Sequence, residues 1–324
     1  MKNIKIADFL LYGLVLLVLA VFIFRGSPKV ESSTFILKTI PLVSLLPHEH
    51  NHGDSIMTSS HHTLSYSMPV ILTEDLWVKG VSYSIKNARE TVLHHAELAI
   101  LNEPDIICPN REGKHIFSVG EDQLYMPEAD FPEGYAHFIP RGSEIFFYTM
   151  FHNPKPPLGY GETHYNVTSE LKLDLASKEE IPGLKPMEFI RLGLTDKPCG
   201  DNEDSYVFKV PAKVSEFVFG SSDGSNPASK YVFPESGKII YMGGHTHGWE
   251  GGKYLSVYLN GKQIKKYETK KSPDNPYTYN TPHGEENIQV KKGDVISITA
   301  TYDNNEPEPL NGAMGMLVIY FAKD

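Results

Sequence analysis

Two histidines one residue apart, His245 and His247, lie in the glycine-rich stretch YMGGHTHGWEGG. Alternate residues of a β-strand share one face, so both imidazoles can point at the same metal ion. A polar rim beside a tight turn would produce the same pattern. The motif therefore predicts a metal site only if further ligands join it from elsewhere in the chain.

A second pair, His94 and His95, lies in ETVLHHAELAI. Neighbouring residues of a regular strand point to opposite faces, so both can bind one ion only if the strand ends or bulges there. A third candidate is His152, which ends the apolar run EIFFYTMFH. A histidine that caps a strand at its rim is the ordinary alternative, and His137 is the main rival for the same role.

Two methionines, Met314 and Met316, share a face in NGAMGMLVIYF near the end of the sequence. Methionine in a strand is usually core filler. Beside several imidazoles, however, a thioether is a soft ligand that favours reduced copper. Zinc would be expected to recruit cysteine or carboxylate, and the chain has only Cys108 and Cys199. Histidines with one sulfur therefore predict copper.

The ordered set of motifs resembles the copper type II, ascorbate-dependent monooxygenases over roughly residues 68 to 321. The matching stretches are HHAEL, FFYTMFHNP, GGHTHGWEGGKYLSVYLNGK, KKGDVISITATYDN and MGMLVIYF. Each motif is weak alone, whereas their order and spacing are fairly specific. The resemblance implies two jelly-roll-like β-sandwich domains that face each other across a water-filled cleft, with one copper in each.

Carried over by motif, the resemblance assigns two ligand sets. The electron-transfer copper would be held by His94, His95 and His152, and the catalytic copper, which binds O2, by His245, His247 and Met314. Met314 is preferred to Met316 because it stands at the strand entrance. Ascorbate would reduce both ions, and a C–H bond of a small organic substrate would be hydroxylated with O2.

Two features depart from the family. Members that act on glycine-extended peptides have an arginine two residues before the His-Thr-His motif, and this chain has Gly243 there. Glycine has no side chain that could bind the peptide carboxylate, so peptide amidation is disfavoured. The chain also has far fewer cysteines, and its single possible disulfide, Cys108 to Cys199, would link the two expected domains or their junction.

The elements that must position these ligands are short β-branched and aromatic runs bounded by Gly, Pro, Asn and Asp. MPVILTEDLWVKG, SYVFKVPA, KIIYMGG and DVISITATYDN are examples. After the N-terminal segment, no helical period persists for more than a turn or two. The sequence therefore predicts an all-β chain with two antiparallel β-sandwich domains, at 68–197 and 198–324, divided near the turn-rich TDKPCGDNE.

The N-terminal segment decides the expected compartment. Lys2 and Lys5 precede an uncharged apolar run, and Arg25 follows it. No small-x-small cleavage motif comes after the run, which favours an uncleaved signal anchor over residues 1–26, a transmembrane helix that leaves the rest extracytoplasmic. Residues 27–67 are rich in Ser, Pro and His, including PHEHNHGDS, and predict a His-rich linker.

The net charge of −10 makes a nucleic-acid partner improbable, because phosphate binding depends on Lys and Arg. The functional prediction is a membrane-tethered copper monooxygenase with two coppers per chain. A non-catalytic extracytoplasmic copper carrier would use the same ligands together with the His-rich linker. A plain adhesion-type sandwich with incidental histidines would bind no stoichiometric copper. The sequence does not give the oligomeric state.

Overall fold

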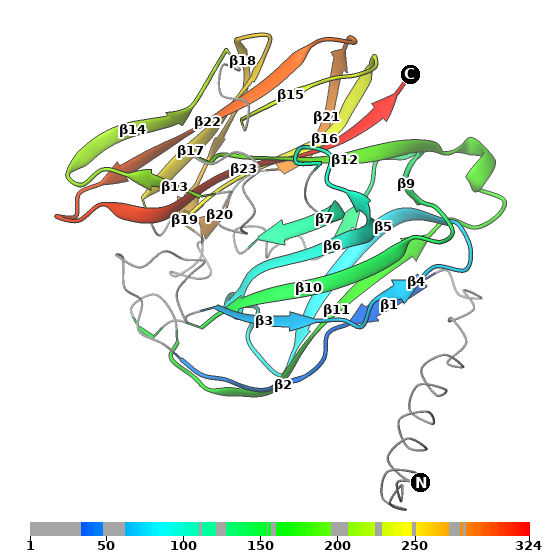
Figure 1. The fold of residues 1–324 in the computed structure, drawn as a ribbon, viewed down its shortest axis with the longest axis horizontal. Helices are drawn as coiled ribbons and strands as arrows, with labels where there is room; N and C mark the ends of the chain where they lie inside the picture. Colours follow the sequence, from blue (N-terminus) through cyan, green and yellow to red (C-terminus); the bar gives the residue numbers. More distant parts are fainter. Residues whose placement is uncertain are drawn as a thin grey trace, which may run out of the picture.

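The structure is a computed structural model that describes residues 34–47, 62–109, 112–120, 128–153, 155–156, 160–195, 207–223, 229–247, 251–271, 279–280 and 283–324. These residues form strands almost throughout, with short 3-10 turns such as η1 (Glu90–Val92) and η3 (Ile181–Gly183) (Figure 1). The strands build several sheets, as expected of β-sandwiches, so the all-β prediction is confirmed.

Three larger sheets and one small sheet make up this architecture. The 11-stranded sheet contains β1 (Thr34–Lys38), β2 (Leu42–Leu45), β5 (Leu76–Lys86), β8 (Glu128–Asp130), β9 (Tyr135–Ile139), β11 (His164–Leu175), β12 (Lys185–Gly193), β13 (Val207–Val210), β16 (Gly237–Thr246), β21 (His283–Val290) and β23 (Leu310–Lys323). The β10 sheet contains β3 (His62–Tyr66), β4 (Val70–Ile71), β6 (Leu93–Pro104), β7 (Glu112–Gly120) and β10 (Glu144–His152). The β22 sheet contains β14 (Val214–Gly220), β15 (Lys230–Val232), β17 (Gly252–Leu259), β18 (Lys262–Glu268) and β22 (Val295–Asn304), and the small sheet contains β19 (Lys270–Lys271) and β20 (Tyr279–Asn280).

The 11-stranded sheet runs through both halves of the chain. Its main order is β1-β11-β5-β9-β12-β23-β16-β21, so β12 lies between β9 and β23. The β12–β9 pairing is parallel, and the β12–β23 pairing is antiparallel. Strands on the two sides of residue 197, the expected domain boundary, therefore hydrogen-bond to each other within one sheet.

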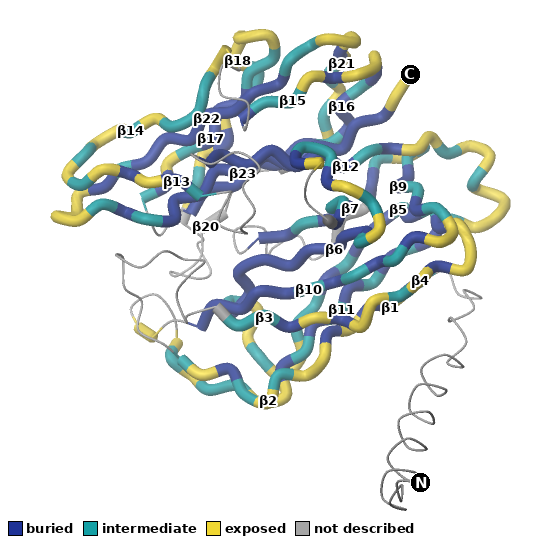
Figure 2. The backbone as a smooth tube through the Cα atoms, in the orientation of Figure 1, coloured by how far each residue is buried: buried dark blue, intermediate teal, exposed yellow. Residues whose placement is uncertain are grey.

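Two main cores use this shared sheet. Leu98 and Phe147 of the β10 sheet pack in one cluster with Leu171 of β11. Ile298 of the β22 sheet packs in the other cluster with Leu317 of β23. Burial is continuous over residues 93–100 of β6, 149–152 of β10 and 312–322 of β23 (Figure 2).

The stretch 27–67, expected to be a linker, differs from that expectation. It contributes β1, β2 and β3, and Phe35 and Leu37 of β1 are buried in the first core. The cause is the alternation in TFILK, which buries every second residue although the surrounding composition is polar. The His-rich residues 48–61 lie outside the described residues.

Within the part of the chain that the structure describes, no helix is long and apolar enough to cross a membrane. The expected anchor at residues 1–26 lies outside that part. The anchor stays a prediction.

Candidate metal centre

A β-bulge places His94 and His95 together. Met150 of β10 pairs with His95, but the next residue, Phe151, pairs with Leu93, so the ladder skips His94. The extra residue changes the local direction of the strand, and the two imidazole rings lie 4.2 Å apart between centroids. The structure therefore contains the bulge that two adjacent histidines need if both are to bind one ion.

His152 joins this pair and His137 does not. The ring of His152, the last residue of β10, lies 6.0 Å from that of His94, and its side chain is buried. His137 belongs to β9, where it pairs with Val78 and Met187. Among the described residues, no ring contact joins His137 to the other histidines. Of the two rivals, His152 therefore lies beside the pair, and its role as a ligand stays a prediction.

The second histidine pair comes from β16 and the residue after it. His245 pairs directly with Met316 of β23, and Thr246 pairs with Gly315. Continuing this register places His247 opposite Met314. Opposed residues of an antiparallel pair share a face, so both histidines and both methionines lie on one face of the 11-stranded sheet. The choice between Met314 and Met316 stays open.

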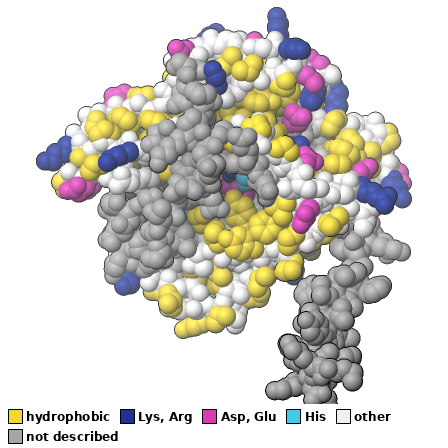
Figure 3. Space-filling view, viewed as in Figure 1, with side chains coloured by type: hydrophobic (Ala, Val, Ile, Leu, Met, Phe, Trp, Pro, Cys, Tyr) yellow, Lys and Arg dark blue, Asp and Glu magenta, His cyan; other side chains and the backbone are white. Residues whose placement is uncertain are grey.

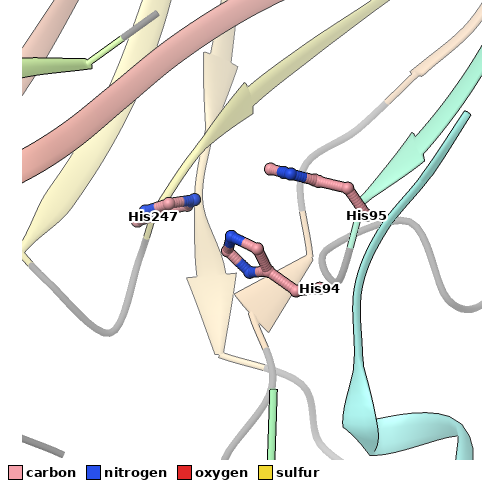
Figure 4. A group of neighbouring side chains, drawn as sticks. All are labelled: His94, His95 and His247. Atoms are coloured by element: carbon pink, nitrogen blue, oxygen red, sulfur yellow. The ribbon is translucent and has the colours of Figure 1, made fainter. Parts of the chain in front are cut away.

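The two histidine pairs meet where the β10 sheet faces the 11-stranded sheet. One ligand atom from each of His94, His95 and His247 lies within 4.8 Å of the other two, and all three side chains are buried (Figure 4). The Nε2 atoms of His95 and His245 are 3.5 Å apart. The two ligand sets expected from the resemblance are thus merged into one cluster, which we call the histidine centre: His94, His95, His152, His245 and His247.

The trio His94, His95 and His247 could hold a metal ion. Metal–imidazole bonds are about 2.0–2.1 Å long, so three nitrogens around one ion in trigonal or tetrahedral geometry are about 3.4–3.6 Å apart. A separation of at most 4.8 Å therefore requires no more than about 1.4 Å of closure. All three donors are imidazoles, which suit zinc, copper, iron and nickel.

Glycines let the chain pack tightly around His245 and His247. A Cβ on Gly244 would lie 2.6 Å from the ring of Tyr267, and one on Gly252 would lie 2.7 Å from the carbonyl oxygen of His247. The backbone N–H of Gly252 donates to that same carbonyl oxygen at 3.0 Å. These glycines allow close approach beside the two imidazoles.

The hydroxyl of Tyr302 holds the backbone of two expected ligands. It accepts hydrogen bonds from the N–H of His247 at 3.0 Å and the N–H of Met314 at 3.2 Å. It also donates to the carbonyl oxygen of Met314. Tyr302 is fully buried on β22, so this bridge ties the histidine centre to the second core.

A buried charged network lies beside His95. Glu97, two residues along β6, accepts from Arg191 of β12 at 2.5 Å and from the Tyr148 hydroxyl at 2.6 Å. His115 of β7 lies 2.8 Å from the same carboxylate oxygen. Burial alone would raise the pKa of Glu97, but Arg191 and His115 outweigh it and hold this pKa well below its usual range. The network joins the β10 sheet to β12 of the 11-stranded sheet next to the centre.

Sequence reasoning missed Tyr302, Glu97 and Arg191. Arg191 did carry a signal, since a charged residue inside the apolar run MEFIRLGL needs a buried partner. Glu97 shares a strand face with His95 by alternation. Tyr302 carried none, because its role depends on β22 lying against both β16 and β23. Cys199 lies outside the described residues, so its pairing with Cys108 stays a prediction.

No family model matches this chain, and no curated protein does. Several solved structures resemble it distantly. PNGase F, a glycosylasparaginase from Flavobacterium meningosepticum, has 8% identity and a TM-score of 0.40, covering 88% of this chain and 95% of that one. The major capsid protein P2 of bacteriophage PM2 has 9% identity and a TM-score of 0.31, covering 90% and 98%. VP54 of PBCV-1 has 10% identity and a TM-score of 0.28, covering 92% and 96%. At these values no activity is transferred from any of them.

Proposed function

We propose that this chain is a copper-dependent monooxygenase that hydroxylates a C–H bond of a small organic substrate, using O2 and a one-electron reductant such as ascorbate. The observation that carries the proposal is the convergence of His94, His95 and His247, from two sheets, within 4.8 Å. Met316, which pairs with His245, and Met314 on the same strand face support copper over zinc. The proposal includes the two jelly-roll-like domains, the N-terminal anchor and an extracytoplasmic location.

The chain's own residues would prepare the centre for a metal. The bulge at His94 and the end of β16 aim the imidazoles inward, and the Tyr302 hydroxyl fixes the backbone next to His247. When bound, copper supplies one-electron redox chemistry and activation of O2. The resemblance implies two ions per chain. Two separate ions would require His94, His95 and His152 to move apart from His245, His247 and Met314.

A second candidate is a non-catalytic copper-binding or carrier protein. The observation in its favour is burial, because His94 and His247 have no exposed surface and His95 has only 8%. A closed centre of this kind holds a metal well but limits the access of O2 and substrate. The two candidates use the same ligands and differ in turnover.

Copper content and reductant-driven oxygen uptake separate the candidates. We expect the full-length parent to bind copper stoichiometrically and to consume O2 with ascorbate. His247→Ala should lose the shared ion and the uptake, whereas His164→Gln on β11 should keep both. Copper without uptake would favour the carrier. A parent that binds no copper at equilibrium would refute both.

A further inference from the structure

Three aromatic side chains form a strip beside the histidine centre. Tyr66 of β3 pairs with Tyr148 of β10, and Phe146 precedes Tyr148 by two residues, so all three rings share one sheet face. The rings of Tyr66 and Phe146 stack at 5.6 Å between centroids. Tyr148 lies 6.4 Å from Tyr66 and 6.1 Å from Phe146. We call Tyr66, Phe146 and Tyr148 the aromatic strip.

The aromatic strip runs from solvent toward the histidine centre. Tyr66 is 41% exposed, and Phe146 and Tyr148 are half-buried. The next residue on this face of β10 is the buried Met150, which pairs with His95. A two-residue step along a strand covers about 7 Å, so the strip ends one side-chain position from a candidate ligand.

This face is open in the space-filling view. Hydrophobic side chains gather over β3 and β10, and histidine and acidic side chains are visible in the hollow beside them (Figure 3). Stacked or tilted rings at these separations present flat apolar surfaces to a ligand. The arrangement is therefore suited to a flat apolar molecule that lies along the strip.

The charged groups beside the strip already pair with one another. The Tyr148 hydroxyl donates to Glu97, and Glu97 is paired with the buried guanidinium of Arg191. A second carboxylate, Asp105, lies 3.4 Å from His115 of the same network. A charged ligand would therefore lose its hydration on entering the hollow without gaining a free counter-ion from these groups. The chemistry of this face therefore favours an uncharged ligand.

We propose that the aromatic strip is the binding subsite for an uncharged aromatic small molecule, which lies against Tyr66 and Phe146 with one end toward His95. The proposal rests on the proposed function insofar as this molecule is the substrate of the metal centre. Binding of the ring itself requires only the strip.

Binding of 4-methylphenol to the full-length chain, measured by calorimetry, tests the subsite. We expect 4-methylphenol to bind at least tenfold more tightly than its charged analogues 4-methylbenzylamine and 4-methylbenzoate. Tyr66→Ala and Phe146→Ala should each weaken its binding about tenfold, the loss of one ring contact. The control Tyr165→Ala removes an aromatic residue that is 63% exposed on β11, outside the strip, and should bind like the parent.

Copper content, measured on the same samples, distinguishes failure of the subsite from failure of the proposed function. Both strip variants should keep the copper content of the parent, because neither residue belongs to the histidine centre. Normal copper with equal binding of all three probes would overturn the subsite alone, as would an equal loss in Tyr165→Ala. Tight, strip-dependent binding by a chain without copper would support the subsite and overturn the metal function.

Discussion

At the scale of single residues, the histidine centre depends on neighbours that are not themselves candidate ligands. Tyr302 fixes backbone positions at both His247 and Met314 through one hydroxyl. Groups that orient metal ligands in this way commonly affect metal affinity 10- to 100-fold. The centre is therefore expected to be as sensitive to Tyr302 as to some of its own ligands.

Tyr302→Phe should separate this role from packing, because it keeps the ring and removes the hydroxyl. We expect a loss of about 1–3 kcal/mol in the free energy of unfolding, from backbone groups left without their partner, and weaker copper binding by about tenfold or more. Tyr267→Phe is the matched control. Its buried hydroxyl has no hydrogen-bond partner among the described residues, so both quantities should stay near the parent values. Equal losses in the two variants, by urea unfolding and copper titration, would contradict the role of the hydroxyl.

His137 gives a pH dependence that is separate from the metal. Burial lowers its pKa to about 3 from the ordinary 6.5. The unfolded chain therefore binds a proton below about pH 6.5 that the folded chain does not, and stability falls as the pH drops from 6.5 toward 3. At pH 5 the loss is roughly 2 kcal/mol relative to neutral pH.

Urea unfolding at pH 7 and pH 5 measures that loss. His137→Leu removes the titrating group. The loss of stability between pH 7 and pH 5 should therefore be about 2 kcal/mol smaller in this variant than in the parent. Parallel pH profiles for the variant and the parent would show that His137 does not cause the acid sensitivity.

At the scale of elements, β16 can present its histidines only because its backbone lies close to its neighbours. Gly244→Ala would bring a methyl group against the Tyr267 ring and should destabilise the fold by about 1–3 kcal/mol. Gly284→Ala, on the adjacent β21, is the control, since a Cβ there meets nothing within 4 Å. Thermal unfolding of both variants checks the expectation. A similar change in both would mean that the glycine itself, rather than its contact with Tyr267, sets the cost.

The strand β12 carries the buried charge that joins the 11-stranded sheet to the β10 sheet. Arg191→Met would leave the Glu97 carboxylate buried without its guanidinium, which typically costs about 3–5 kcal/mol. Lys79→Met breaks the exposed Lys79–Glu180 pair instead and should change the stability far less, because solvent screens that pair. Chemical unfolding compares the two directly. A loss for Arg191→Met as small as that for Lys79→Met would contradict a structural role for the buried pair.

Several elements were predictable from short-range pattern, and their pairings were not. The β-branched and aromatic runs EIFFYTMFH and KIIYMGG predicted strands at β10 and β16, and the adjacency of His94 and His95 predicted that the strand must end or bulge there for both to bind one ion. The strand at TFILK was missed because its polar surroundings dominated the composition. The sequence did not predict that the histidines form one cluster. Their proximity depends on how the β10 sheet packs on the 11-stranded sheet, and no local pattern encodes that contact.

At the scale of the whole molecule, a shared metal ion would tie two sheets together. His94 comes from the β10 sheet and His247 follows β16 of the 11-stranded sheet. An ion that binds only the folded form adds about 2.7 kcal/mol at a concentration 100 times its Kd. Copper should therefore raise the Tm of the parent, and both His94→Ala and His247→Ala should lose this gain. If only one of these variants lost the copper-dependent rise in Tm, the ion would be bound by histidines of one sheet alone.

The position of β23 has a consequence for the order of assembly. Its residues, 310–323, follow both β12 and β16 in the chain, yet β23 lies between them and is hydrogen-bonded to each. Until this segment has been synthesised, β12 and β16 lack their common neighbour, and the second core lacks Leu317 and Phe321. The histidines of the two sheets are therefore expected to come together late in folding, after residues 310–323 have left the ribosome.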